Sequence, residues 1–368
     1  MNYNDMLVNF YKEQGCNTDI IYNFYYDETN NYIKFQFKKD KELNIDNFLK
    51  KYCLGGITLP KQKDCNMLWN ELQSALKIKG ELKFKQINSG KTDTFTNCMR
   101  GRILNKILLF LNEKDIYLHC FTHDNLYDVI IDIVDSLLLE KYEDTYYFLQ
   151  REMKCQLYLF VLKDIGYFVD ILKESNYPNI IGENIKNFCS SMFKWINMVD
   201  TDGLFGLECC RQLFREYSKK DHLIFLENNK DGIIIDGYQH LNFDMCIKFR
   251  KSFHCFDEIS EVQSKFKKLN ITNYTFIDSE KCFPIQIADT MVGLLNKFFE
   301  FVDTNSYEDI ITIFYKMSDI QKQNFLLFLK LYKKSLDVSE FFMCFYEPES
   351  VVNERNAKIF NIVSSLIQ

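Results

Sequence analysis

The sequence predicts an α/β protein with a long helical insertion and a helical C-terminal extension. Short segments rich in Ile, Tyr and Phe recur in both halves of the chain and are typical of buried strands, and longer segments between them have helical spacing. Strands mixed with helices in this order favour an α/β core. Residues 141–219 and 303–368 show helical patterns only, so we place them outside that core.

Composition narrows the class of protein. With 368 residues, the chain is long enough for one large domain or two modest ones. Its net charge of −6 argues against a wholly basic nucleic-acid coat but leaves room for a local basic groove. The N-terminus lacks the basic start and apolar run of a signal peptide, so we expect a cytoplasmic protein whose 13 cysteines are reduced.

The first part of the chain alternates between predicted strands and helices. Residues 20–26 predict a strand, and the alternating segment 32–38 predicts a hairpin with it. Further strands are expected at 55–59 and 116–121, with 80–87 extended or in a loop. Helical spacing marks residues 67–79, 95–113 and 125–140.

Strand signals return after the helical stretch 141–219, which has a break at 176–179. We expect strands at 232–236, 252–257 and 272–278, and helices at 257–269 and 284–302. The remainder, 303–368, predicts helices without a strand. Its apolar clusters at 325–332 and 341–346 must bury a face, so we expect them to pack on the insertion or to form a homodimer or partner contact.

The first strand ends in two adjacent carboxylates, in the segment YYDETNNY at 25–32. Side chains alternate between the faces of a strand, so Asp27 should share a face with Tyr25 while Glu28 points the other way. Only one of the two acids is then expected in a site on a given face. A plain turn is the alternative, because Asp, Thr and Asn all favour turns.

The predicted helix around residues 285–301 carries a second isolated carboxylate. Apolar residues cover most of its circumference, so the helix should be largely buried. Asp289 lies at the edge of a narrow polar stripe, and a lone buried carboxylate is costly without a partner or a metal. A stripe that faces water is the alternative. The stripe consists of Gln286, Asp289, Thr290, Gly293 and Lys297.

Three segments together resemble the "domain of unknown function 3800" family. They are FYYDETNNY, KGELKF and FIDSEKCFPIQIADTMVGLL. Members open with a strand ending in Asp-Glu-Ser, and Thr29 here stands where Ser is usual. They continue with a Glu-(Ile/Leu)-Lys motif and end with a Ser before Gln-(Leu/Ile)-Ala-Asp on a helix. The matches to this last motif are Ser279, Gln286, Ala288, Asp289 and Gly293.

The resemblance implies a ribonuclease H-like fold, in which a mixed sheet is flanked by helices. The core would comprise 16–140 and 220–302, with 141–219 as a helical insertion and 303–368 as a helical extension. In such a fold an Asp of the first strand, a Glu, an Asp of a later strand and an Asp of a final helix meet. The residues that match are Asp27, Glu81 and Asp289.

The fourth carboxylate is either Asp257 or Asp236, each of which ends a predicted strand. Asp257 is followed by a helix, a strand and the helix of Asp289, an order that fits the fold better. The segment HCFDE also resembles a His-Asp-Glu pattern of some family members. We therefore favour Asp257 and keep Asp236 as the alternative.

The resemblance also implies a chemistry. Converging carboxylates suit Mg²⁺ or Mn²⁺, and two such ions cleave phosphodiesters. Lys83 would lie on the same side of an extended segment as Glu81 and could contact a phosphate, unless it is simply solvated. We therefore expect a metal-dependent nuclease or phosphodiesterase that acts on DNA or RNA. The resemblance also implies a role as a defence or toxin-like effector.

Two alternatives stay open: a catalytically silent binding subunit, and a phosphoesterase of small nucleotides. Local runs of basic residues could line a nucleic-acid groove or form a solvated face. They comprise Lys248, Arg250, Lys251, Lys265, Lys267 and Lys268.

Overall fold

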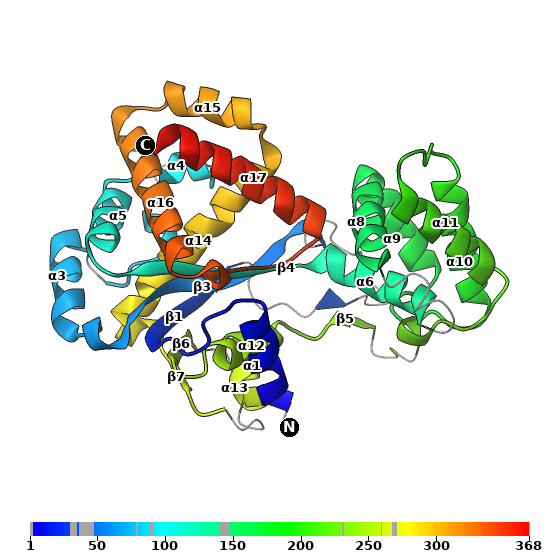
Figure 1. Cartoon of the computed structure of the whole chain (residues 1–368), viewed down its shortest axis with the longest axis horizontal. Helices are drawn as coiled ribbons and strands as arrows, with labels where there is room; N and C mark the ends of the chain where they lie inside the picture. Colours follow the sequence, from blue (N-terminus) through cyan, green and yellow to red (C-terminus); the bar gives the residue numbers. More distant parts are fainter. Residues whose placement is uncertain are drawn as a thin grey trace.

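A mixed six-stranded sheet with helices on both faces forms the centre of the molecule (Figure 1). It is seen in a computed structural model that describes residues 3–29, 35–36, 48–78, 80–88, 92–139, 148–227, 229, 232–258, 260–266 and 271–367. The predicted mixed sheet flanked by helices is thereby confirmed.

The strand order is β7-β6-β1-β3-β4-β8, which places the first strand in the interior of the sheet. β3 runs antiparallel to both β1 and β4, while β6 is parallel to β1 and β7 is parallel to β6. The strands are β1 (Tyr22–Thr29), β3 (Lys51–Pro60), β4 (Tyr117–Asp124), β6 (Phe253–Asp257), β7 (Tyr274–Ile277) and β8 (Met343–Tyr346).

Two apolar clusters cover the two faces of this sheet. On one face α14 (Phe283–Thr304) lies directly on β1 and β3. It shares that face with α3 (Asn66–Leu76), α4 (Phe95–Cys98), α5 (Arg102–Glu113), α15 (Tyr307–Lys316), α16 (Asp319–Val338) and α17 (Glu349–Leu366). The other face is covered by α1 (Tyr3–Glu13), α12 (Gln239–Lys248) and α13 (Ser260–Phe266) (Figure 1).

The predicted helical insertion stands beside the sheet. Helix α6 (Asn125–Leu138) leaves the end of β4 and packs against α8. The bundle contains α8 (Gln150–Val161), α9 (Ile165–Glu174), α10 (Glu183–Ile196) and α11 (Phe205–Tyr217). The break expected at 176–179 falls between α9 and α10, and Figure 1 shows the bundle set apart from the helices that cover the sheet.

Two adjacent glycines of β3 allow close contacts, Gly56 with α14 and Gly55 with the neighbouring strand β4. A Cβ added at Gly56 would lie 2.4 Å from the Cβ of Ala288, and the φ of Gly56 is +150°, which other residues rarely adopt. A Cβ at Gly55 would lie 2.5 Å from the carbonyl oxygen of His119. The helix backbone therefore approaches the sheet closely at Ala288, and this contact places the next residue, Asp289.

Three predictions about elements are wrong: the hairpin of 20–26 with 32–38, the single helix 95–113 and the C-terminal extension without a strand. Residues 35–36 (β2) pair with β5 (Ile233–Ile235) in a separate two-stranded sheet, while β1 pairs with β3 and β6, so the expected hairpin does not form. Residues 30–34 and 37–47 lie outside the described part of the chain. The predicted helix 95–113 divides into α4 and α5, because the chain is extended at Gly101.

The C-terminal extension contains a strand, contrary to the prediction of helices alone. β8 pairs in parallel with β4 at the edge of the sheet. A short apolar run such as 341–346 does not distinguish a strand from a buried helix by periodicity. The other apolar residues of the extension also pack mainly on the core, since α16 contacts α5 and β4 while α17 contacts α14.

Replacing Gly56 should loosen α14 from the sheet. We expect G56A to lower the free energy of unfolding by about 2–3 kcal/mol, because the new methyl group clashes with Ala288 at a backbone conformation that alanine disfavours. Chemical denaturation measures the loss. The control is G166A in α9, where a Cβ would meet nothing closer than 3.7 Å, and equal stability of the two variants would contradict the close contact.

Candidate active site

Carboxylates from neighbouring strands meet at one edge of the sheet. β1 and β6 are parallel with Tyr26 opposite Phe256, so Asp27 and Asp257 follow at corresponding positions. Adjacent strands lie about 4.8 Å apart. Asp27 is only 8% exposed, whereas Asp257, the last residue of β6, is half-buried.

The polar stripe of α14 binds the segment that contains Glu81. Gln286 Oε1 accepts a hydrogen bond from the backbone N–H of Leu82 at 3.0 Å, and Asp289 Oδ2 accepts one from that of Phe84 at 2.8 Å. One turn further on, a Cβ at Gly293 would lie 2.5 Å from the Phe84 ring, so only glycine accommodates that ring. This part of the stripe thus faces the 81–84 segment rather than water.

Ser279 joins this segment to the end of β6. Its backbone N–H donates to Asp257 Oδ1 at 3.0 Å, and its hydroxyl donates to Glu81 Oε1 at 2.8 Å. Gln286 Nε2 in turn donates to the carbonyl oxygen of Ser279 at 2.8 Å. Ser279 therefore orients two of the predicted site carboxylates at once, which explains why a serine precedes the Gln-Ile-Ala-Asp motif.

The acids perturb one another. Burial, followed by the charges of Glu28 and Asp289, raises the pKa of Asp27 well above its usual range. Burial, followed by Asp257 and Asp289, raises the pKa of Glu28 to about 7. Burial also raises the pKa of Asp289, opposed by its hydrogen bond from Phe84 and by Lys83. Such mutual effects require the charges to be close together.

Lys83 supplies a positive charge at this site. Its Nζ lies 2.6 Å from Glu81 Oε1. Burial alone would lower the pKa of Lys83, but Glu81, and then Asp289 and Asp27, raise it. Lys83 is therefore a charged group beside the carboxylates, not a lysine that is merely solvated.

The donors suit a hard divalent cation, although they do not enclose one as they stand. Carboxylate oxygens are the ligands that Mg²⁺ and Mn²⁺ prefer. Within the described ranges, no three His, Cys, Asp or Glu side chains are close enough together to hold one ion. Asp257 Oδ1 accepts from the backbone of Ser279 and Glu258, and Asp289 Oδ2 accepts from Phe84, so an ion would be held through the other oxygen of each carboxylate or after a change of these side chains.

Asp236 lies elsewhere. It follows β5 in the two-stranded sheet, is exposed, and its Oδ2 lies 3.0 Å from Lys265 Nζ. The structure thus brings Asp27, Glu81, Asp257 and Asp289 together and leaves Asp236 out.

Glu28 was not expected at this site. Alternation predicts that it points away from Asp27, yet its pKa depends on Asp257 and Asp289. β1 ends at Thr29, one residue later, where a long side chain is less restricted to one face. The signal available in the sequence was the Asp-Glu pair itself.

The basic runs predicted from the sequence consist of ion-paired residues where the structure describes them. Their described members all pair with acids, and the residues Lys267 and Lys268 lie outside the described part of the chain. The pairs are Lys248 with Asp244, Arg250 with Asp5, Lys251 with Asp19 and Lys265 with Asp236, at 3.0, 3.5, 3.2 and 3.0 Å.

Comparison with models of protein families, with curated proteins and with solved structures finds no match to this chain. Among the described helices, none combines the length and apolar character that a membrane span requires.

The pH dependence of stability should reveal the strain at Asp27. Because its pKa is raised in the folded chain, that chain binds protons more readily than the unfolded one, and stability should fall as pH rises above about 4. D27N should reduce this fall and be about 1 kcal/mol more stable at neutral pH. Thermal melts in chelator between about pH 4 and 8 measure it.

The control for this experiment is D236N, which removes an exposed acid outside the cluster. If D27N has the pH dependence of the parent, or melts at lower temperature, Asp27 is a stabilising structural residue instead.

Proposed function

We propose that this chain is a Mg²⁺- or Mn²⁺-dependent nuclease or phosphodiesterase with a ribonuclease H-like core. The observation that carries the proposal is the convergence of Asp27, Glu81, Asp257 and Asp289, which come from four separate segments. Crowded, partly buried acids destabilise a fold, and such sites typically exchange stability for function. A divalent cation would offset their repulsion.

The order of elements supports the ribonuclease H-like part of the proposal. Asp27 lies on the first strand, which is interior to a mixed sheet, and Asp257 ends the parallel strand beside it. After Asp257 come a helix, a strand and then α14 with Asp289. This is the sequence of elements that the resemblance implies.

The roles of the chain's own groups follow from their positions. Ser279 fixes the carboxylates of Glu81 and Asp257, and the 81–84 segment is held to α14 by Gln286 and Asp289. Lys83 places a cation where the phosphate of a substrate would approach the acids. The bound ions would activate the attacking water and stabilise the leaving oxygen.

One observation favours the catalytically silent alternative. The hydrogen bond from Phe84 to Asp289 gives this carboxylate a structural role that needs no metal. An asparagine at 289 would keep an acceptor for Phe84 but would lose the charge, so the two roles can be separated by experiment.

Substitution of single acids tests the proposal. D27N, D257N and D289N should each lower Mn²⁺-dependent cleavage of single- or double-stranded DNA or RNA by about a hundredfold or more, because each loses a charged group at the reacting centre. The matched control D236N, outside the cluster, should keep full activity.

Thermal melts of the same variants verify that they fold. Full activity in a folded D27N or D289N would refute the proposed chemistry. Loss of activity in D236N with retention in D257N would exchange the assignments of these two aspartates.

A further inference from the structure

A cleft of about 540 Å³ lies between the helical insertion and the core. Its volume is within the range typical of small-ligand sites, which often form where two parts of a protein meet. α8 of the insertion forms one wall, and α14 and α17 form another. The start of β3 and the end of β4 lie at its floor, which is the edge of the sheet where β1 also ends.

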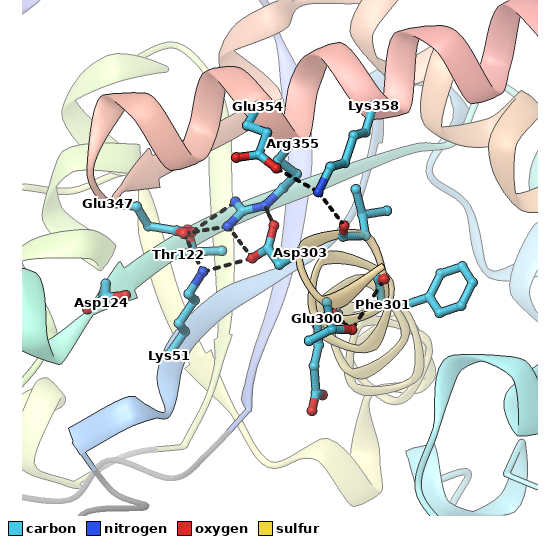
Figure 2. A network of polar contacts seen from close by, with 12 residues as sticks. Lys51, Thr122, Asp124, Glu300, Phe301, Asp303, Glu347, Glu354, Arg355 and Lys358 are labelled. Atoms are coloured by element: carbon cyan, nitrogen blue, oxygen red, sulfur yellow. Dashed lines mark hydrogen bonds and ion pairs between the residues drawn. The ribbon is translucent and has the colours of Figure 1, made fainter. Parts of the chain in front are cut away.

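The floor is a buried network of balanced charges. Figure 2 shows the guanidinium of Arg355 between the carboxylates of Asp303 and Glu347, with the Lys51 ammonium bound to both acids. Arg355 is 1% exposed and donates to each acid through two nitrogen–oxygen contacts of 2.5–3.1 Å. Within this network two cations thus neutralise two anions.

Other groups give the floor hydrogen-bonding capacity. The hydroxyl of Thr122 donates to Glu347 Oε1 at 2.5 Å, and the buried carboxylate of Asp124 accepts from the Tyr158 hydroxyl at 2.7 Å. The Tyr158 bond also ties α8 to the end of β4. The deep end of the cleft is therefore polar, and it contains the Asp124 carboxylate in addition to the balanced network.

One wall of the cleft is apolar, and its rim carries exposed charged side chains. Leu159 of α8 and Leu162, directly after this helix, line the cleft and remain 42% and 38% exposed, so they offer an apolar surface. Lysines stand at the rim, among them Lys297 of α14 and Lys358 of α17, which pair with Glu300 and Glu354 at 3.0 and 2.8 Å. A fitting ligand has a flat apolar face, an uncharged hydrogen-bonding edge and an anionic group.

The cleft and the candidate active site lie along the same helix. Asp303 is 14 residues after Asp289 on α14, which is roughly 21 Å at the helical rise per residue. Asn296, between them, lines the cleft and accepts a hydrogen bond from Cys53 of β3 at 3.3 Å. A chain molecule bound along α14 would reach from one to the other.

We propose that this cleft binds a nucleotide, with its base against Leu159 and Leu162 and its phosphate at the lysines of the rim. The choice of ligand rests on the proposed nuclease function. The nucleotide is either free or part of a strand whose scissile phosphate lies at the carboxylates.

The test is equilibrium binding in chelator, where cleavage does not occur. Fluorescence anisotropy follows short labelled single-stranded DNA and RNA, with unlabelled nucleoside monophosphates as competitors. L159D should remove the apolar surface and repel the phosphate, and so weaken binding by about tenfold or more, the scale of one base contact. L109D, at a similarly exposed leucine of α5 outside the cleft, is the matched control.

The outcomes separate this site from the nuclease chemistry. Binding that is weakened by L159D but not by L109D supports the cleft, even if no cleavage is ever found. Competition by monophosphates alone indicates a free nucleotide, and its absence indicates a strand. Equal binding by both variants, or no binding of strand or nucleotide, overturns the proposal, even if cleavage depends on Asp27.

Discussion

The close contact of α14 with the sheet governs the arrangement of the rest of the structure. Gly56 has no side chain at the crossing point, so Ala288 rests directly on the strand. The same helix then presents Gln286 and Asp289 to the backbone of the 81–84 segment, and Gly293 to the ring of Phe84. The close approach of α14 to the sheet therefore positions both the 81–84 segment and the carboxylate of Asp289.

The two ends of α14 differ in the balance between acids and cations around them. Near its start, acids gather with Lys83 as their cation, and the pKa values of Asp27 and Asp289 rise. Near its end, Asp303 belongs to a network in which every acid has a cation, and Lys51 together with Arg355 holds the pKa of Glu347 down to about 2 despite its burial. Buried pairs of this kind favour a specific arrangement more than net stability. The unbalanced cluster is the one that a cation would complete.

The sequence predicted the local features well and the long-range pairings poorly. Strand and helix types followed from periodicity, and the resemblance brought out acids that are distant in the chain. Pairing in the sheet depends on contacts that no local pattern contains, so β2 and β8 were misplaced. The network around Arg355 joins this residue to Lys51, Asp303 and Glu347, and none of these four belongs to a motif seen in the sequence.

The choice between Asp236 and Asp257 shows that the order of predicted elements can identify a site residue. Both end an apolar run, but only Asp257 ends a strand beside β1, as the order of elements after it suggested. Glu28 was missed because alternation is a weaker guide in the last residues of a strand.

Diffraction at the manganese absorption edge, from crystals grown with Mn²⁺, tests the metal site most directly. We predict anomalous peaks bound by Asp27, Asp257 and Asp289. An acid cluster without a peak would contradict the proposed metal site.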